Sequence, residues 1–243
     1  MGRLPYPMIR KKGEVGFRRI SWDEAFNFIS SKIKVTKADR MMFYLTSKGI
    51  SNEVYYVAQK VARFLGTNNI DHAARLCHSP SSMAVKEMIG VSASTCSYKD
   101  WIGTSLLIFF GSNVANSQPV TTKYMYYAKL KGTKIVVVNP YKELGLERYW
   151  IPSTFESALF GTKLADEFFL VNTGGDIAFI NGVIKHMIEK NWIDWEFINN
   201  YTFGFEALKE EIEKQSWKDL EKFSGLSRDE MLKFAKLYSE AKS

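Results

Sequence analysis

The chain has 243 residues, 46% of them hydrophobic, which suits one large α/β domain or two small ones. Its two cysteines cannot build a disulfide framework, its N-terminal stretch lacks the apolar segment of a signal peptide, and no apolar run is long enough to span a bilayer. These features exclude a disulfide-rich secreted protein and an integral membrane protein, and they predict a cytoplasmic one.

The first part of the chain predicts helices around a short strand. The motif Ser21-Trp-Asp-Glu24 is a capping box, and the apolar residues after it recur at helical spacing. Residues 41–46 predict a strand that runs into a polar turn. Asn52 is expected to cap a second helix that stops at Gly66, and the proline of Ser79-Pro80 is typical of the first turn of a third helix.

Three units, each a strand followed by a turn, come next along the chain. They are 106–110 with the turn 111–118, 134–138 with 139–142, and 167–171 with 172–176. Helices are predicted at 120–130, 177–190, 206–214, 217–223 and 227–241. This alternation of strands and helices predicts βαβ units, and hence a Rossmann-like, doubly wound parallel sheet with flanking helices.

The turns that end these strands carry small and amide residues. Ligands of open α/β sheets bind at the carboxyl ends of strands, where helix N-termini offer N–H groups to phosphates. Gly111, Gly174 and Gly175 allow close backbone approach, whereas Asn113, Asn116, Asn139 and Asp176 could bond a base or a ribose. No turn matches the dinucleotide fingerprint or the P-loop, and ordinary turn chemistry explains each one about as well. Three such turns in succession favour a nucleotide-like ligand.

Cys77 is followed at once by His78. A thiolate suits soft transition metals and a neutral imidazole accepts a proton near neutral pH, so the pair fits a catalytic metal site. Taken alone, the dipeptide is more typical of a buried, inert thiol beside a surface histidine. The other cysteine, Cys96, is expected to be structural, a small buried hydrophobe.

The net charge of +7 leaves three interpretations open. A basic protein could bind nucleic acid, but here the basic residues are spread along the chain and often stand beside acidic ones. A solvated basic surface is the simpler interpretation, and a positive cleft for a phosphate-rich ligand is the third. We therefore expect no nucleic-acid partner.

A series of sequence blocks runs nearly from end to end. The blocks are 2–9, 20–25, 46–53, 64–70, 75–80, 111–113, 138–140, 161–166 and 174–178. In this order they resemble the molybdopterin-dependent oxidoreductases of the dimethyl-sulfoxide-reductase superfamily, in the formate-dehydrogenase-like branch. Any single block is unspecific, whereas the ordered set is specific.

The resemblance implies roles for individual residues. Cys77 matches the family's molybdenum ligand, and His78 matches the neighbouring histidine that handles the substrate proton. Lys48 stands where the family places a basic or amide residue against the pterin. The residues that match the loops around one molybdopterin guanine dinucleotide are Gly111, Ser112, Asn113, Asn116, Ser117, Asn139, Pro140, Gly174, Gly175 and Asp176. The phosphates of this cofactor would also account for the net positive charge of the chain.

The resemblance implies a fragment of a molybdenum bis-(molybdopterin guanine dinucleotide) oxidoreductase, of formate dehydrogenase type, that takes two electrons from a small substrate. Family members are considerably longer, and no Cys-x-x-Cys is present to hold an iron–sulfur cluster. Residues 1–243 are expected to form one α/β fragment, with a cofactor and active-site part at 1–100 and a guanine-dinucleotide part at 101–243. Alone, the chain should be inactive, and its expected partner is the rest of the enzyme or an electron-transfer subunit.

A second class of function stays open. The chain could be a non-catalytic descendant that binds a guanine nucleotide or serves as a scaffold for other subunits. The Cys77-His78 pair favours the enzyme, because a scaffold has no need of such a pair. The absence of the rest of the family's length from this chain favours the non-catalytic module.

Overall fold

The computed structural model describes residues 4–46, 49–152 and 154–242, and it divides into two compact units, 1–93 and 94–243. Each unit is described by itself. The expected division at residue 100, with separate cofactor roles for the two parts, stays a prediction. The predicted site residue Lys48 lies outside the described residues.

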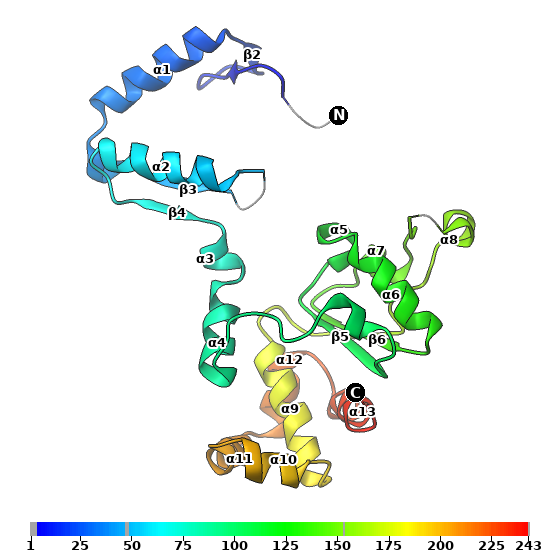
Figure 1. The fold of residues 1–243 in the computed structure, drawn as a ribbon. Coiled ribbons are helices and arrows are strands. Elements are labelled where there is room, and N and C mark those ends of the chain that lie inside the picture. Colours follow the sequence, from blue (N-terminus) through cyan, green and yellow to red (C-terminus); the bar gives the residue numbers. More distant parts are fainter. Residues whose placement is uncertain (1–3, 47–48, 153, 243) are drawn as a thin grey trace. The chain divides into compact units, whose positions relative to one another are not determined.

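The first unit begins with a small hairpin and a long helix. Strands β1 (Met8–Ile9) and β2 (Arg18–Arg19) pair antiparallel, and α1 (Trp22–Val35) follows (Figure 1). The Ser21 hydroxyl accepts a hydrogen bond from the Glu24 amide at 3.1 Å, which confirms the predicted N-terminus of this helix. The Glu24 carboxylate itself pairs with Arg18 at 3.1 Å.

A βαβ unit follows in the same part of the chain. Its elements are β3 (Phe43–Leu45), α2 (Asn52–Phe64) and β4 (Ile70–His72), and the two strands pair parallel, with Leu45 opposite His72. The residue that caps α2 is Ser51, so the prediction of Asn52 as the cap is wrong by one position. Helices α3 (Ala74–Cys77) and α4 (Ser79–Ile89) come directly after β4, and Pro80 lies in the first turn of α4 as predicted.

The second unit is built on a three-stranded parallel sheet. Its strands are β5 (Leu106–Phe110), β6 (Lys134–Asn139) and β7 (Glu167–Leu170), in the order β5-β6-β7. The helices between them are α5 (Val114–Ser117), α6 (Thr121–Leu130), α7 (Leu144–Glu147) and α8 (Phe155–Phe160). Because each strand continues into a helix and then into its parallel neighbour, the carboxyl ends of all three strands lie at one edge.

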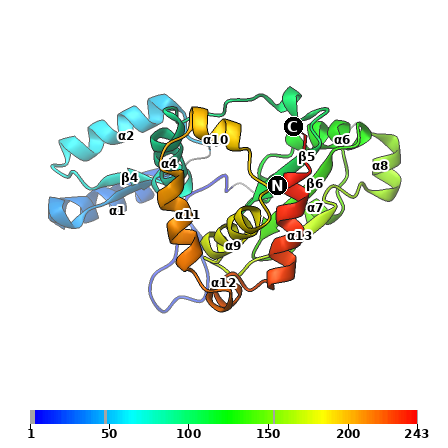
Figure 2. The ribbon, with the colours of Figure 1, turned by 90° about the horizontal axis from the view of Figure 1, so that it is seen from below.

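Five helices complete the second unit. They are α9 (Asp176–Glu189), α10 (Trp195–Tyr201), α11 (Phe205–Lys214), α12 (Trp217–Ser224) and α13 (Arg228–Ser239). Helices α9 and α13 lie side by side, as Figures 1 and 2 both show. A full capping box joins Ser227 and Glu230 at the start of α13, as the sequence predicted.

The sheet of the second unit is covered on both faces. Along β6, Val136 and Val138 pack into a core with α9, α12 and α13. The alternate residues Ile135 and Val137 pack into a second core with α5, α6 and α7. All four are fully buried, as expected of a central strand in a parallel sheet. The prediction of a doubly wound α/β sheet is confirmed.

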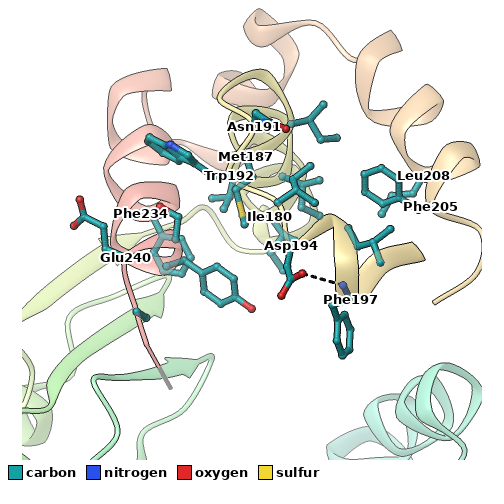
Figure 3. A pocket seen from close by; sticks show the side chains of 18 of the residues that line it. Ile180, Met187, Asn191, Trp192, Asp194, Phe197, Phe205, Leu208, Phe234 and Glu240 are labelled. Carbon is teal, nitrogen blue, oxygen red and sulfur yellow. Dashed lines mark hydrogen bonds between the residues drawn. The ribbon is translucent and has the colours of Figure 1, made fainter. Parts of the chain in front are cut away.

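Strand β5 forms an edge of this sheet. Among the described strands it pairs with β6 alone, and Phe110 at its end is 43% exposed. A largely apolar cavity of about 1100 Å³ lies beside it, lined by Ile108 and Phe110 and by side chains of α9, α10 and α13 (Figure 3). None of the predicted site residues that the structure describes lines this cavity.

Within the part of the chain that the structure describes, no helix has both the length and the apolar character needed to cross a membrane.

Candidate functional site

The first unit places Cys77 and His78 just beyond the carboxyl end of the β3–β4 pair. The Ala73 amide donates to the Leu45 carbonyl at 3.1 Å and so extends the pairing beyond His72. Cys77 is the last residue of α3, and His78 stands between α3 and α4. Both side chains are exposed and the thiol is free. This exposure contradicts the alternative of a buried, inert thiol.

The junction between α3 and α4 is held by local hydrogen bonds. The Ser79 hydroxyl donates to the Ala74 carbonyl at 2.8 Å, and the His78 amide donates to the same carbonyl at 3.2 Å. The Ser82 amide then donates to the His78 carbonyl at 2.8 Å, which starts α4. The backbone of the Cys77-His78 pair is therefore fixed from both sides.

An ion pair precedes this junction. Nε of Arg75 donates to Oδ2 of Asp71 at 2.6 Å, and the His72 amide donates to the other carboxylate oxygen at 2.9 Å. The Arg75 hydrogen bond, followed by that of the His72 amide, lowers the pKa of Asp71.

A hollow of about 700 Å³ adjoins the ion pair within the first unit. Its lining includes Tyr55, Asp71, His72, Arg75 and His78. The Tyr55 ring meets the His72 ring edge-on, with centroids 5.6 Å apart. The hollow brings a guanidinium, a carboxylate and two imidazoles together on the side of the junction where His78 lies. Such a lining can bind a small polar molecule and move a proton to or from it.

In the second unit, the predicted turns meet at the carboxyl edge of the sheet. The Gly111 amide donates to the Val138 carbonyl at 2.9 Å, and the Val171 amide donates to the Asn139 carbonyl at 3.2 Å. The turns after β5, β6 and β7 therefore begin side by side. Gly111 has a φ of +59° and open space around its Cα, so the backbone there is accessible to a ligand.

Glu143 joins the first two turns, and the sequence analysis did not identify it. Its carboxylate accepts hydrogen bonds from Nδ2 of Asn113 at 2.6 Å and from Nδ2 of Asn139 at 3.4 Å. Asn116 in turn donates through Nδ2 to Oδ1 of Asn113 at 2.9 Å. The structure thus brings the three predicted asparagines together around one buried carboxylate, which is 7% exposed.

The third turn is packed against the end of α12. The Asn172 amide donates to the Ser224 carbonyl at 2.7 Å, and a Cβ on Gly175 would lie 2.6 Å from the Phe223 carbonyl oxygen. Packing therefore requires a glycine at 175, whether or not a ligand binds there. Gly174, by contrast, has a φ of +80° and open space.

The remaining predicted residues lie at the same edge of the sheet. Asp176 starts α9, Ser117 ends α5 and is exposed, Ser112 is half-buried, and Pro140 is exposed. Their roles toward a ligand stay predictions.

At the Cys77 site the protein offers a metal one cysteine sulfur. Within the described residues, no group of three or more His, Cys, Asp or Glu side chains could hold a metal ion. Cys77 is exposed and free, so it fits as a single soft ligand to a metal whose other ligands come from its cofactor. The second cysteine, Cys96, is also exposed, so the prediction that it is buried is wrong. Its segment, Ser94 to Ser97, has no apolar side chain that would draw it into a core.

Comparison with curated proteins gives several relatives of similar identity. Formate dehydrogenase H of Escherichia coli (strain K12) is 32% identical over 246 residues, which are 99% of this chain and 32% of that protein. The F420-dependent formate dehydrogenase 2 subunit alpha of Methanococcus maripaludis is 33% identical, over 99% of this chain and 33% of that protein. Protein YdeP of Escherichia coli (strain K12) is 30% identical over the same shares. The chain thus spans about a third of the length of these relatives.

A solved structure, the acetylene hydratase from Pelobacter acetylenicus, has the same fold. It superposes with a TM-score of 0.58 at 24% identity and covers 99% of this chain and 31% of that one. The family model described as molybdopterin oxidoreductase matches residues 3–198. Since this match covers most of the sequence, the chain belongs to the molybdopterin oxidoreductase family.

Proposed function

We propose that the chain is part of a formate-dehydrogenase-like molybdenum oxidoreductase, and that it carries the protein ligand to the metal. The observation that supports this most is the exposed Cys77-His78 pair, fixed at the carboxyl end of a parallel strand pair in a chain of this family. The formate dehydrogenases among its relatives point to formate as the substrate.

Each residue of the pair would do a different task. Cys77 would hold the metal through its thiolate, and His78 would take the substrate proton through its imidazole. When bound, the molybdenum cofactor supplies the two-electron oxidation. Arg75 would orient an anionic substrate, since its remaining N–H groups are not used by Asp71. Lys48 is proposed to lie against the pterin.

The second unit would hold one guanine dinucleotide arm of the bis-(molybdopterin guanine dinucleotide) cofactor. The turns that support this proposal are Gly111 to Ser117, Asn139-Pro140 and Gly174 to Asp176, whose first residues lie side by side. The second arm and the rest of the substrate site would come from polypeptide outside these residues or from an electron-transfer subunit. Alone, the chain would therefore be inactive. Its two unpaired cysteines favour a reducing compartment, which we take to be the cytoplasm.

The test is metal and nucleotide content. The complete enzyme would be purified from a host that makes the molybdenum cofactor, as wild type, Cys77→Ser and Cys96→Ser. We expect molybdenum and releasable guanine nucleotide in the wild type and in Cys96→Ser, and loss of molybdenum in Cys77→Ser. Cys96 is a matched control because its thiol is also free and exposed. Equal molybdenum in all three proteins would contradict the ligand assignment. Guanine nucleotide without any molybdenum would favour the non-catalytic module.

A further inference from the structure

Glu143 is a buried carboxylate whose partners are all hydrogen-bond donors. Asn113 and Asn139 donate to it through their amide nitrogens, and the Tyr141 hydroxyl donates to it as well. Within the described residues no lysine or arginine pairs with Glu143. Burial of a charge without a counter-ion is costly, so three donors around it are what its burial requires.

The chemistry of a carboxylate fixes the orientation of both asparagines. An ionised carboxylate only accepts hydrogen bonds, whereas a carboxamide has a donor end and an acceptor end. Asn113 and Asn139 must therefore turn their NH₂ groups toward Glu143. Their Oδ1 atoms must then point elsewhere, and neither side chain can reverse without placing oxygen against oxygen.

This orientation is passed on to the surface. Oδ1 of Asn113 accepts from Nδ2 of Asn116 at 2.9 Å and from the Asn116 amide at 3.4 Å. With its NH₂ group committed to Asn113, the exposed side chain of Asn116 is set to present Oδ1 outward as an acceptor. A buried carboxylate thus determines which end of a surface carboxamide faces a ligand.

We propose that Glu143 is a positioning residue for a guanine base, which it acts on through Asn113 and Asn116. An acceptor at Asn116 matches the N–H donors on the edge of guanine that carries the ring amide and the exocyclic amine. This inference rests on the proposed function, because it assumes that the carboxyl edge of β5, β6 and β7 holds a guanine nucleotide. It adds the residue that determines whether the side chain of Asn116 presents a hydrogen-bond acceptor or a donor to the base.

The test separates charge from packing. Glu143→Gln keeps the size of the side chain but places an NH₂ group next to one of the asparagines, which must then reverse to present its oxygen. The matched control is Glu147→Gln, four residues further on in α7, where the carboxylate pairs with Lys142 at 2.7 Å outside the cluster. Calorimetry with GDP, and with ADP as the comparison, would be run on the full chain together with thermal unfolding.

We expect Glu143→Gln to weaken GDP binding about tenfold, which corresponds to about 1.4 kcal/mol, with the unfolding midpoint unchanged. Glu147→Gln should bind GDP as the wild type does. A double-mutant cycle tests the relay: Asn116→Ala alone should weaken GDP binding to a similar extent, and Glu143→Gln should add little to it. A merely structural role for Glu143 would not produce this coupling.

Several outcomes would overturn the inference. If the wild type binds GDP and both Glu143→Gln and Asn116→Ala bind it equally well, Glu143 does not position the base, while the proposed function stands. If Glu143→Gln unfolds, the variant of the exposed residue Asn116 still tests the inference. Unchanged GDP binding by a folded Asn116→Ala would show that Asn116 does not contact the base, and the proposed role of Glu143 would fail. If the wild type binds no GDP, the guanine site of the proposed function fails, and the inference fails with it.

Discussion

Nε of Arg75 lies 2.6 Å from Oδ2 of Asp71, so an ion pair joins β4 to α3 two residues before Cys77. Arg75 is exposed and Asp71 is half-buried, so solvent screens the pair and its contribution to global stability is small. Its effect is local, since it holds the first turn of α3 against the end of the strand and occupies the Nε edge of the guanidinium.

Arg75→Gln should raise the pKa of Asp71, which the Arg75 hydrogen bond now holds low. A lowered carboxyl pKa stabilises the fold at neutral pH, and this contribution is lost as the pH falls through that lowered pKa. NMR titration of the Asp71 carboxyl in the wild type and in Arg75→Gln would measure the shift. Arg63→Gln is the control, because Arg63 hydrogen-bonds Asn68 instead. An unchanged Asp71 pKa in Arg75→Gln would show that the pair does not persist in solution.

His78→Ala should slow turnover of the complete enzyme about a hundredfold, the usual scale for loss of a general acid or base. Molybdenum content should stay the same, since Cys77 provides the ligand in our proposal. If His78→Ala lost molybdenum together with its turnover rate, His78 would instead be a second ligand to the metal. The control is His72→Ala, which removes the other imidazole of the same hollow.

Gly175→Ala should destabilise the second unit by about 3 kcal/mol, the upper range for overpacking. The added methyl group would meet the Phe223 carbonyl oxygen at 2.6 Å and the Ser224 Cα at 3.0 Å, and backbone atoms cannot rotate away. At Gly174 the added methyl group would meet open space. Gly174→Ala should therefore lower the free energy of unfolding by only about 1 kcal/mol, the cost of a left-handed backbone for alanine. Urea unfolding of both variants gives the comparison, and equal costs would contradict this account.

The stability of the second unit should fall as the pH drops below neutral. Burial lowers the pKa of His186, whose ring stacks on Trp217 and whose Nε2 lies 3.0 Å from the Arg228 carbonyl oxygen. The unfolded chain takes up this proton near the ordinary histidine pKa of about 6.5, while the folded chain takes it up only at lower pH. Between the two pKa values the unfolded state binds more protons, so stability decreases with decreasing pH.

Urea unfolding at about pH 7.5 and about pH 5.5 would measure this dependence. His186→Phe should show a smaller difference between the two pH values than the wild type. His72→Phe, which changes an exposed histidine of the first unit, should leave the difference unchanged. A wild type without any loss of stability at the lower pH would contradict the prediction.

The sequence predicted the strands of the second unit well because they are continuous apolar runs. Residues 106–110 match β5, and 134–138 match β6 to within one residue. Strands β1, β2 and β4 and helices α3, α5, α7, α8 and α10 were not predicted. They are short, and β4 contains an aspartate and a histidine, so tertiary pairing rather than local pattern decides their conformation.

The candidate site was predictable only in part. Adjacent residues such as Cys77 and His78 could be found by their chemistry, and the asparagines by their position after strands. Glu143 could not, because its importance depends on two partners, one of them thirty residues away, and on its burial. Gly175 was assigned to ligand approach, whereas its immediate neighbour is the Phe223 carbonyl, a contact across 48 residues that no local pattern encodes.

The open edge at β5 has a practical consequence for the purified protein. Strand β5, Leu-Leu-Ile-Phe-Phe, leaves one side of its main chain without a neighbouring strand among those described, beside an apolar cavity. Uncharged apolar edges of this kind are where separate molecules join into aggregates. Association of this kind rises with protein concentration, which will thus limit how long a sample stays monodisperse. A charge at this edge is better placed at Phe110, which is 43% exposed, than at Ile108, which packs against the core behind the sheet.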